Sequence, residues 1–168
     1  MPIQRLNHAV LYVRDVARSV AFYTEALGFR VVTSIPGRAA FLQAAGSTND
    51  HDLGLFAVGD RAGASTAGRS TVGLYHLAWE VDTLAELQRI SGVLTERGAL
   101  VGASDHGSTK ALYAQDPDGI EFEVSWLVPA ALLDPEQTIS TRPLHLEREI
   151  ERYGADTRGG VGVSVPTA

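Results

Sequence analysis

The fold is decided by two stretches that share one pattern: LNHAVLYVRDVARSVAFYTEALGFRVV (residues 6–32) and LYHLAWEVDTLAELQRISGVLTERGALV (residues 74–101). Each stretch opens with a short run of alternating character, which is typical of a half-buried strand. Each run carries a histidine near its start, His8 in the first stretch and His76 in the second. The recurrence indicates an internal repeat, so we expect two copies of one structural unit.

A helix is expected after each of these first strands. Asp15 and Asp82 stand where the helices begin, and an aspartate is a good N-cap because its carboxylate accepts free backbone N–H groups of the first turn. Gly28 and Gly98 follow the helices, as a left-handed C-terminal cap requires. Apolar residues recur at helical spacing at Val16, Val20, Tyr23 and Leu27, and again at Leu84, Leu87, Ile90 and Leu94.

Three short strands are expected after each helix. They lie at about Arg30–Ser34, Arg38–Ala44 and His51–Val58 in the first copy, and at about Leu100–Ala103, Lys110–Gln115 and Ile120–Leu127 in the second. Each copy is therefore a βαβββ module, which makes the fold class α+β. The predicted domain spans residues 1–128, with module 1 at about 3–58, module 2 at about 73–128, and a Gly- and Ser-rich link at Gly59–Thr71.

The remaining residues, 129–168, are expected to form a C-terminal extension. Pro129–Pro143 shows no regular pattern, whereas Leu144–Tyr153 (LHLEREIERY) predicts one short amphipathic helix. Gly154–Ala168 is rich in glycine and small residues, and it is expected to be a flexible tail.

The composition excludes several classes of function. The chain has 168 residues, 45% of them apolar and 20% charged, a balance that suits a globular domain. The net charge of −6 and the lack of a basic cluster disfavour nucleic acid. No apolar run reaches the length of a membrane span, no signal peptide is recognisable, and there is no cysteine for disulfides or thiolate metal sites. We therefore expect a cytoplasmic protein with a small-molecule partner.

Three side chains form a candidate set of metal ligands: His8, His76 and Glu123. Equivalent strands of two packed modules could direct both imidazoles into a shared cleft. Phe122 and Val124 flank Glu123 and should point to the opposite face, toward the core. Two imidazoles and one carboxylate leave coordination positions open, which is the arrangement of non-haem Fe(II) oxygenases. Mn(II) would also fit, whereas a closed structural zinc site would require four protein ligands.

A longer motif makes a family resemblance specific. His106 is followed after seven residues by Tyr113, then by Asp116-Pro-Asp-Gly119, and Glu123 comes ten residues after the tyrosine. This segment, the repeat and the paired histidines resemble the vicinal oxygen chelate (glyoxalase/bleomycin resistance/dioxygenase) superfamily, over about Ile3 to Leu127. Within it, the segment resembles the ring-cleavage motif of extradiol catechol 2,3-dioxygenases in a single-domain form.

The resemblance implies a half-open barrel of the two modules around a metal site, and an oxidoreductase of aromatic hydrocarbon catabolism. Such an enzyme inserts both atoms of O2 into a catechol at a mononuclear Fe(II) centre. His51-Asp-Leu-Gly-Leu resembles the stretch that holds the acid/base histidine, so His51 is expected in that role. His106 is expected to form a hydrogen bond to the substrate or to bound oxygen, and Tyr113 to a substrate oxygen or a metal ligand; a homodimer is implied.

Other members of the superfamily remain alternatives. A glyoxalase-like lyase or isomerase would need a carboxylate ligand in the strand HDLGLFAV, which has Leu53, Gly54 and Leu55 at its centre. A fosfomycin-type thiol transferase uses the same His-His-Glu set without needing His51, His106 and Tyr113. A metal-free binding protein of the bleomycin-resistance kind would lack the ligand set.

Overall fold

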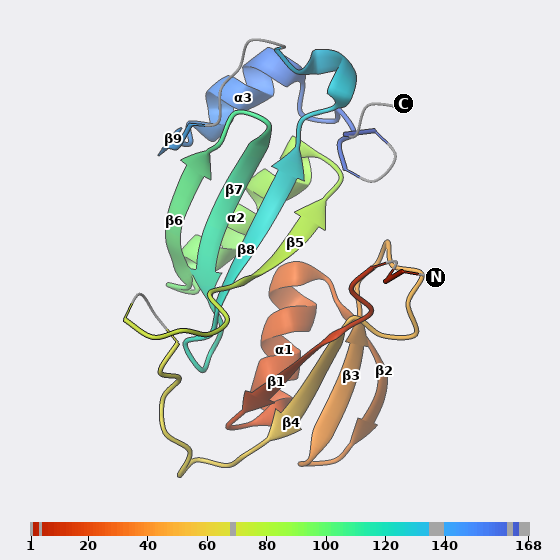
Figure 1. The fold of residues 1–168 in the computed structure, drawn as a ribbon, viewed down its shortest axis with the longest axis vertical. Coiled ribbons are helices and arrows are strands. Elements are labelled where there is room, and N and C mark those ends of the chain that lie inside the picture. The colour runs from red at the N-terminus through yellow and green to blue at the C-terminus, as the bar shows by residue number, and fades with distance from the viewer. Residues whose placement is uncertain (1, 4, 68–69, 135–139, 161–162, 165–168) are drawn as a thin grey trace. The chain divides into compact units, whose positions relative to one another are not determined.

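The computed structural model describes residues 2–3, 5–67, 70–134, 140–160 and 163–164 of the chain. Its contacts divide the chain into two compact units, which are drawn in Figure 1. Unit 1 is Met1–Ser65 together with Asp116–Gly119, and unit 2 is Thr66–Gln115 together with Ile120–Ala168. Each unit contains one βαβββ succession, so the predicted α+β class and the repeat are confirmed.

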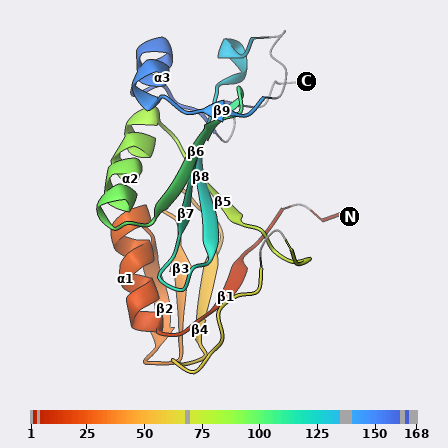
Figure 2. The same ribbon diagram turned by 90° about the vertical axis from the view of Figure 1, so that its left-hand side faces the viewer.

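Unit 1 is a four-stranded open sheet with one helix. Its elements are β1 (Ala9–Val13), α1 (Val16–Leu27), β2 (Arg30–Ile35), β3 (Ala39–Gln43) and β4 (Leu53–Ala57). The strand order is β1-β4-β3-β2, with β1 parallel to β4 and the other neighbours antiparallel. Figure 2 shows α1 along one face of the sheet. Leu11 and Val13 of β1 are buried while Val10 and Tyr12 are exposed, as the period of two requires.

Helix α1 begins and ends as predicted. Asp15 is the N-cap and accepts a hydrogen bond from the amide of Arg18 at 3.1 Å, and Gly28 adopts φ = 73° at the C-terminal cap. The buried face differs from the prediction, because Val20 and Leu27 are only half-buried. The buried face of α1 consists of Val16, Ser19, Phe22, Tyr23 and Ala26. It therefore includes the small side chains of Ser19 and Ala26.

The predicted turn Asp116–Gly119 is present, and its contacts group it with unit 1. Asp118 accepts hydrogen bonds from the backbone amide and the guanidinium of Arg14 at 2.9 and 3.0 Å, and from the guanidinium of Arg18 at 2.6 Å. Burial raises the pKa of the Asp118 carboxyl, but these hydrogen bonds and charges lower it below its ordinary value. The turn that leads into Glu123 is therefore held by charge-assisted hydrogen bonds.

Unit 2 is a five-stranded open sheet. Its elements are β5 (Leu77–Val81), α2 (Leu84–Glu96), β6 (Leu100–Asp105), β7 (Thr109–Gln115), β8 (Glu121–Leu127), the 3₁₀ turn η1 (Ala130–Leu132), β9 (Arg142–Pro143) and α3 (Leu146–Tyr153). The strand order is β5-β8-β7-β6-β9, with β5 parallel to β8. Strand β9 comes from the C-terminal extension and adds an edge to the module, an addition that the irregular pattern of Pro129–Pro143 did not predict.

The core of unit 2 follows the predicted helical pattern. The apolar positions expected in α2 are all buried: Leu84, Leu87, Ile90 and Leu94. The prediction that Asp82 caps this helix is wrong, because Thr83 is the N-cap and accepts a hydrogen bond from the amide of Glu86 at 3.2 Å. Two capping residues stand next to each other here, and the helix begins one residue later than the repeat suggested.

The C-terminal extension is joined to unit 2 by hydrogen bonds. The predicted helix is present as α3, and His145 is its N-cap residue. We assign no functional role to His145. Residues 161–162 and 165–168 of the expected flexible tail lie outside the described residues. The amide of Gly159 donates to the carbonyl of Asp82 at 2.8 Å, and Trp126 Nε1 donates to the carbonyl of Thr157 at 3.2 Å.

The only lysine of the chain, Lys110, is completely buried in unit 2. Its Nζ lies 2.6 Å from Asp105 Oδ1 and 2.9 Å from Glu149 Oε2, and 5.6 Å from the centre of the Tyr153 ring. Burial raises the pKa of the Asp105 carboxyl, but hydrogen bonds from Lys110 and the Gly107 amide bring it below its ordinary value. The cluster therefore ties α3 to strands β6 and β7.

Candidate functional site

Two candidate metal ligands meet in unit 2. His76 immediately precedes β5, and Glu123 lies on β8, the parallel neighbour of β5. His76 Nε2 is 3.3 Å from Glu123 Oε2, and their side chains are 23% and 13% exposed. Phe122 and Val124 on either side of Glu123 are buried, as predicted from the alternation of the strand. Glu123 is thus held on the sheet face away from the helix-covered core.

Tyr113 and His106 lie on the same side of unit 2 as Glu123. Tyr113 on β7 is the direct cross-strand partner of Glu123. His106 Nε2 is 2.9 Å from the same hydroxyl. Burial and the charge of Glu123 raise the pKa of Tyr113 to about 12, so the phenol keeps its proton at physiological pH. A hydrogen bond and a cross-strand pairing therefore bring the three residues together on one side of the sheet.

The other two predicted site residues meet in unit 1. The rings of His8 and His51 are stacked with centres 4.4 Å apart. His8 Nδ1 donates to Asn7 Oδ1 at 2.7 Å, which leaves Nε2 with a free lone pair. His51 Nδ1 lies 3.2 Å from Asp50 Oδ2, so its Nε2 is the basic atom. The amide and imidazole of His51 lower the pKa of the Asp50 carboxyl.

The loop before β4 is held by a residue that sequence reasoning did not identify. The carboxylate of Asp52 accepts hydrogen bonds from Ala44 N at 2.8 Å, Ser47 Oγ at 2.7 Å and Asn49 Nδ2 at 2.8 Å. Asn49 Nδ2 also donates to the carbonyl of Asn7 at 2.6 Å. The loop carrying His51 is thereby joined to the segment carrying His8. The sequence signal that could have identified Asp52 is its position directly after His51.

The sheet registers identify the position in unit 1 that corresponds to Glu123. Ala78 lies two residues after His76 and pairs with Glu123, while Val10 lies two residues after His8 and pairs with Gly54. A glycine therefore stands where unit 2 has its carboxylate. The repeat supplies two histidines but only one acidic ligand.

Two of the three candidate donor atoms are spaced as one divalent ion would require. Two donors about 2.1 Å from one ion and at right angles to each other would be roughly 3 Å apart, close to the 3.3 Å between His76 Nε2 and Glu123 Oε2. The Nδ1 of His76 is buried without a hydrogen-bond partner among the described residues. Among the described residues, no group of three or more His, Asp or Glu side chains is placed so that it could hold a metal ion. His8 belongs to unit 1, whereas His76 and Glu123 belong to unit 2.

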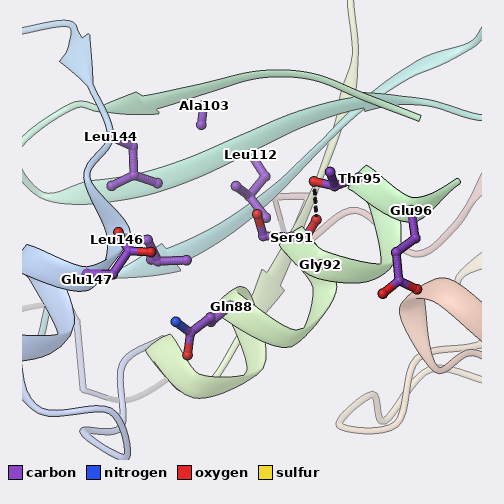
Figure 3. Close-up of a pocket in the computed structure, with 10 residues that line it drawn as sticks. All are labelled: Gln88, Ser91, Gly92, Thr95, Glu96, Ala103, Leu112, Leu144, Leu146 and Glu147. Atoms are coloured by element: carbon purple, nitrogen blue, oxygen red, sulfur yellow. Dashed lines mark hydrogen bonds between the residues drawn. The ribbon is translucent and has the colours of Figure 1, made fainter. Parts of the chain in front are cut away.

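A cavity of about 500 Å³ lies elsewhere in unit 2, between α2, the sheet and the start of α3 (Figure 3). Leu112 lines it, whereas the adjacent Tyr113 points to the opposite face of the sheet. None of the predicted site residues is among the ten that line this cavity, so it is separate from the candidate site. No helix in the described part of the chain is long and apolar enough to span a membrane.

Comparison with known proteins identifies relatives. The family model described as Glyoxalase/Bleomycin resistance protein/Dioxygenase superfamily matches residues 5–124. The chain is 33% identical over 120 residues to a catechol-2,3-dioxygenase of Bacillus subtilis (strain 168), and the match covers 71% of this chain and 40% of that protein. This chain therefore corresponds to less than half of the dioxygenase.

Other relatives match over most of their own length. A lactoylglutathione lyase of Salmonella typhimurium (strain LT2) is 29% identical over 127 residues, with 71% of this chain and 90% of that protein covered. A crystal structure of a glyoxylase/bleomycin resistance protein/dioxygenase domain from Frankia sp. EAN1pec superposes with a TM-score of 0.61 at 24% identity. It covers 74% of this chain and 92% of that domain. The last likeness concerns the fold alone.

Proposed function

We propose that this chain is an extradiol ring-cleaving dioxygenase of catecholic substrates. The premise is that it belongs to the Glyoxalase/Bleomycin resistance protein/Dioxygenase superfamily. The observation that carries the proposal is the grouping of His106, Tyr113 and Glu123 on one side of the sheet. It sets an imidazole and a phenol, both able to hydrogen-bond to a substrate oxygen, beside a candidate metal ligand. A lyase or a binding protein has no evident need for both groups.

The proposed cofactor is Fe(II), with Mn(II) as the other ion that suits the donors. His8 Nε2, His76 Nε2 and Glu123 would hold it, since two imidazoles and one carboxylate form an open site. When bound, the ion would acidify a catechol hydroxyl and bring the catechol and O2 together. Both atoms of O2 would be incorporated into the ring-opened product.

The remaining residues would handle protons and developing charge. His51 is held by Asp50 through Nδ1, so its Nε2 can accept the second catechol proton and return it as the ring opens. Tyr113 stays protonated at neutral pH and can donate to a substrate oxygen as negative charge develops there. His106 lies within hydrogen-bond reach of that hydroxyl and adds a second donor.

The proposal is tested by anaerobic reconstitution with Fe(II), followed by a panel of substituted catechols in air. We expect oxygen uptake and a yellow ring-fission product from at least one of them. Protein loaded with Mn(II) and protein without metal serve as comparisons. If no catechol gives either signal with protein that has bound Fe(II), the proposed function is wrong.

Replacing His51 by alanine should separate proton transfer from metal binding. We expect His51→Ala to bind Fe(II) with the stoichiometry of the wild type while kcat falls on the order of 10²- to 10³-fold, because the base is lost. The control is His145→Ala, which removes an exposed histidine at the start of α3. Full turnover by His51→Ala would show that another group is the base.

A glyoxalase-like lyase is the second candidate, because the Salmonella lyase is covered over 90% of its length. The presence of Gly54 at the register position equivalent to Glu123 argues against it, since the second carboxylate ligand is missing. Formation of lactoylglutathione from the methylglyoxal–glutathione adduct by protein loaded with Ni(II) or Zn(II), without ring cleavage, would favour the lyase.

A further inference from the structure

The cavity shown in Figure 3 is bounded by parts of unit 2 that are far apart in the sequence. Helix α2 forms one wall, Leu112 and Ala103 on β7 and β6 form the floor, and Leu144 and Leu146 of the C-terminal extension form the other wall. The extension lies beyond residues 5–124, which the family model matches, so this wall is an addition to the module. The volume of about 500 Å³ lies within the range of about 300–1,000 Å³ that is usual for small-molecule sites.

The extension is held in place on both sides of Leu144. On one side β9 pairs with the end of β6, and on the other Glu149 of α3 lies 2.9 Å from Lys110 Nζ. Leu112 is buried, whereas Leu144 and Leu146 are only half-buried. The cavity is therefore formed without a ligand, and a ligand with an apolar body would remove the remaining apolar surface from water.

Gly92 lies in the interior of α2 and lines the cavity. Glycine is among the least favourable residues in a helix interior. Gly92 does not have a positive φ, and a Cβ at this position would meet nothing within 4 Å beyond the adjoining parts of its own helix. Neither the backbone conformation nor crowding therefore requires glycine here. The neighbours of Gly92 at helical spacing, Ser91 excepted, line the same wall: Gln88, Thr95 and Glu96. The missing side chain keeps space open in that wall.

The polar groups around the cavity are suited to a cation that donates hydrogen bonds. Thr95 donates its hydroxyl proton to the carbonyl of Ser91 at 2.7 Å, the bond drawn in Figure 3, so in this arrangement its oxygen accepts from a ligand. Glu96 and Glu147 contribute carboxylates, and neither has an ion-pair partner among the described residues.

No positive charge offsets these carboxylates within the cavity. The described residues that line it include no lysine, arginine or histidine. The last turn of α2 also contains no basic residue, so the partial negative charge of the helix C-terminus adds to that of Glu96. Apolar floor and negative rim together favour a ligand that is apolar at one end and positively charged at the other.

We propose that this cavity binds a small organic amine in its ammonium form. The apolar body of the amine would lie on Leu112, Leu144 and Leu146, and its ammonium group would face the carboxylates of Glu96 and Glu147. Leu112 and Tyr113 are neighbours on β7 and face opposite sides of the sheet. The site is therefore separate from the candidate metal ligands, and the inference does not rest on the proposed function.

The proposal is tested with phenylbutylamine as the probe. Phenylbutanol has the same apolar body without the charge, and phenylpentanoate reverses the charge. In calorimetric titrations of the metal-free protein, we expect the amine to bind about 3- to 5-fold more tightly than the alcohol, and the carboxylate to bind most weakly. Added salt should reduce the difference. In ¹H–¹⁵N NMR spectra, the amine should shift the amide signals of Gly92, Leu112 and Leu146.

The Gly92→Leu variant tests whether the ligand occupies the cavity. Leucine favours the helix and its side chain would fill the space at the wall, so the melting temperature should not fall. We expect the affinity for phenylbutylamine to fall on the order of 10-fold. The matched variant Gly92→Ala adds one methyl group and should keep the affinity within about 2-fold of the wild type.

The charge is tested by the double variant Glu96→Gln and Glu147→Gln. It should bind the amine no more tightly than the wild type binds the alcohol. The control is Glu151→Gln, which removes an exposed carboxylate of α3 that does not line the cavity and should leave the affinity unchanged.

Several results would overturn the proposal. They are the absence of saturable binding of the amine, equal affinities for amine and alcohol, and an unchanged affinity in Gly92→Leu or in the double variant. Amide shifts centred on His106 and Tyr113 instead of Gly92 and Leu112 would show that the amine binds on the other face of the sheet. The probes carry no vicinal hydroxyl groups, so these measurements are independent of whether any catechol is cleaved.

Discussion

The Glu123→Ala variant is expected to lose high-affinity Fe(II) binding and to lose ring cleavage on the order of 10³-fold or more. The variant removes the single carboxylate of the candidate ligand set, and no acidic residue of β4 can replace it because Gly54 stands at the equivalent register position. The site would keep two imidazoles, which do not neutralise the charge of a hard divalent ion. The pKa of Tyr113 would also fall, because the charge of Glu123 contributes to raising it.

The control for this loss is Glu121→Ala. Glu121 lies two residues earlier on β8 and therefore on the same side of the strand as Glu123. Glu121→Ala removes the same charge at a position nearer the turn. Metal analysis gives the number of metal ions bound per chain. The difference between the melting temperatures with and without metal shows how much metal binding stabilises the folded state. We expect metal to raise the melting temperature of wild type and Glu121→Ala only. An equal rise in Glu123→Ala would show that Glu123 is not a ligand.

The features that could be predicted from sequence are those encoded by local pattern. The βαβββ repeat, the cap at Asp15 and the turn Asp116–Gly119 depend on periodicity, capping chemistry and turn residues within a few positions. The cap at Asp82 was wrong because Thr83 satisfies the same chemistry one residue later. Pattern alone does not decide between two adjacent capping residues, since both side chains can reach free amides.

The candidate site was predictable to the extent that it lies on the repeat. The alternation that buries Phe122 and Val124 was correctly predicted. The parts that were missed depend on contacts between residues distant in sequence, such as Thr141 with His106 or Asn49 with the carbonyl of Asn7. Such pairs leave no periodic trace, because each partner alone is an ordinary polar loop residue.

Lys110 was missed for a different reason. It shares the side of β7 that carries Leu112 and Ala114, both of which are buried. By the same alternation, the only lysine of the chain should have been expected to be buried. A buried ammonium group requires ionic partners, and the carboxylates of Asp105 and Glu149 provide them.

The Lys110→Met variant is accordingly expected to lose about 3–5 kcal/mol of unfolding free energy at neutral pH. Methionine fills similar space, but the carboxylates of Asp105 and Glu149 would be left partly buried without a cation. Urea unfolding measures the loss. The control is Arg148→Met, which removes an exposed cation from the same helix, α3, and should change the free energy by less than about 1 kcal/mol.

The dependence on pH distinguishes lost charge pairing from lost packing. In the wild type the folded pKa of Asp105 is below its unfolded value near 4, so its contribution is present above that value and is lost as the pH falls through the folded pKa. Lys110→Met removes the hydrogen bond and the charge of Lys110 that lower this pKa, while burial still raises it and the Gly107 amide and Arg142 still lower it. The variant therefore gains less stability than the wild type from the ionised carboxylate of Asp105. We expect the difference between variant and wild type to narrow as the pH falls through the range in which this carboxyl takes up its proton.

Neutralising all three charges should recover most of the stability. In the triple variant Lys110→Met, Asp105→Asn and Glu149→Gln no charge is left unpaired, and the amide oxygen introduced by Asp105→Asn could still accept from the Gly107 amide. The triple variant should unfold with nearly the wild-type free energy and with little change between pH 7 and pH 4. If Lys110→Met is as stable as Arg148→Met, or if its deficit does not depend on pH, the cluster does not hold α3 to the sheet through charge.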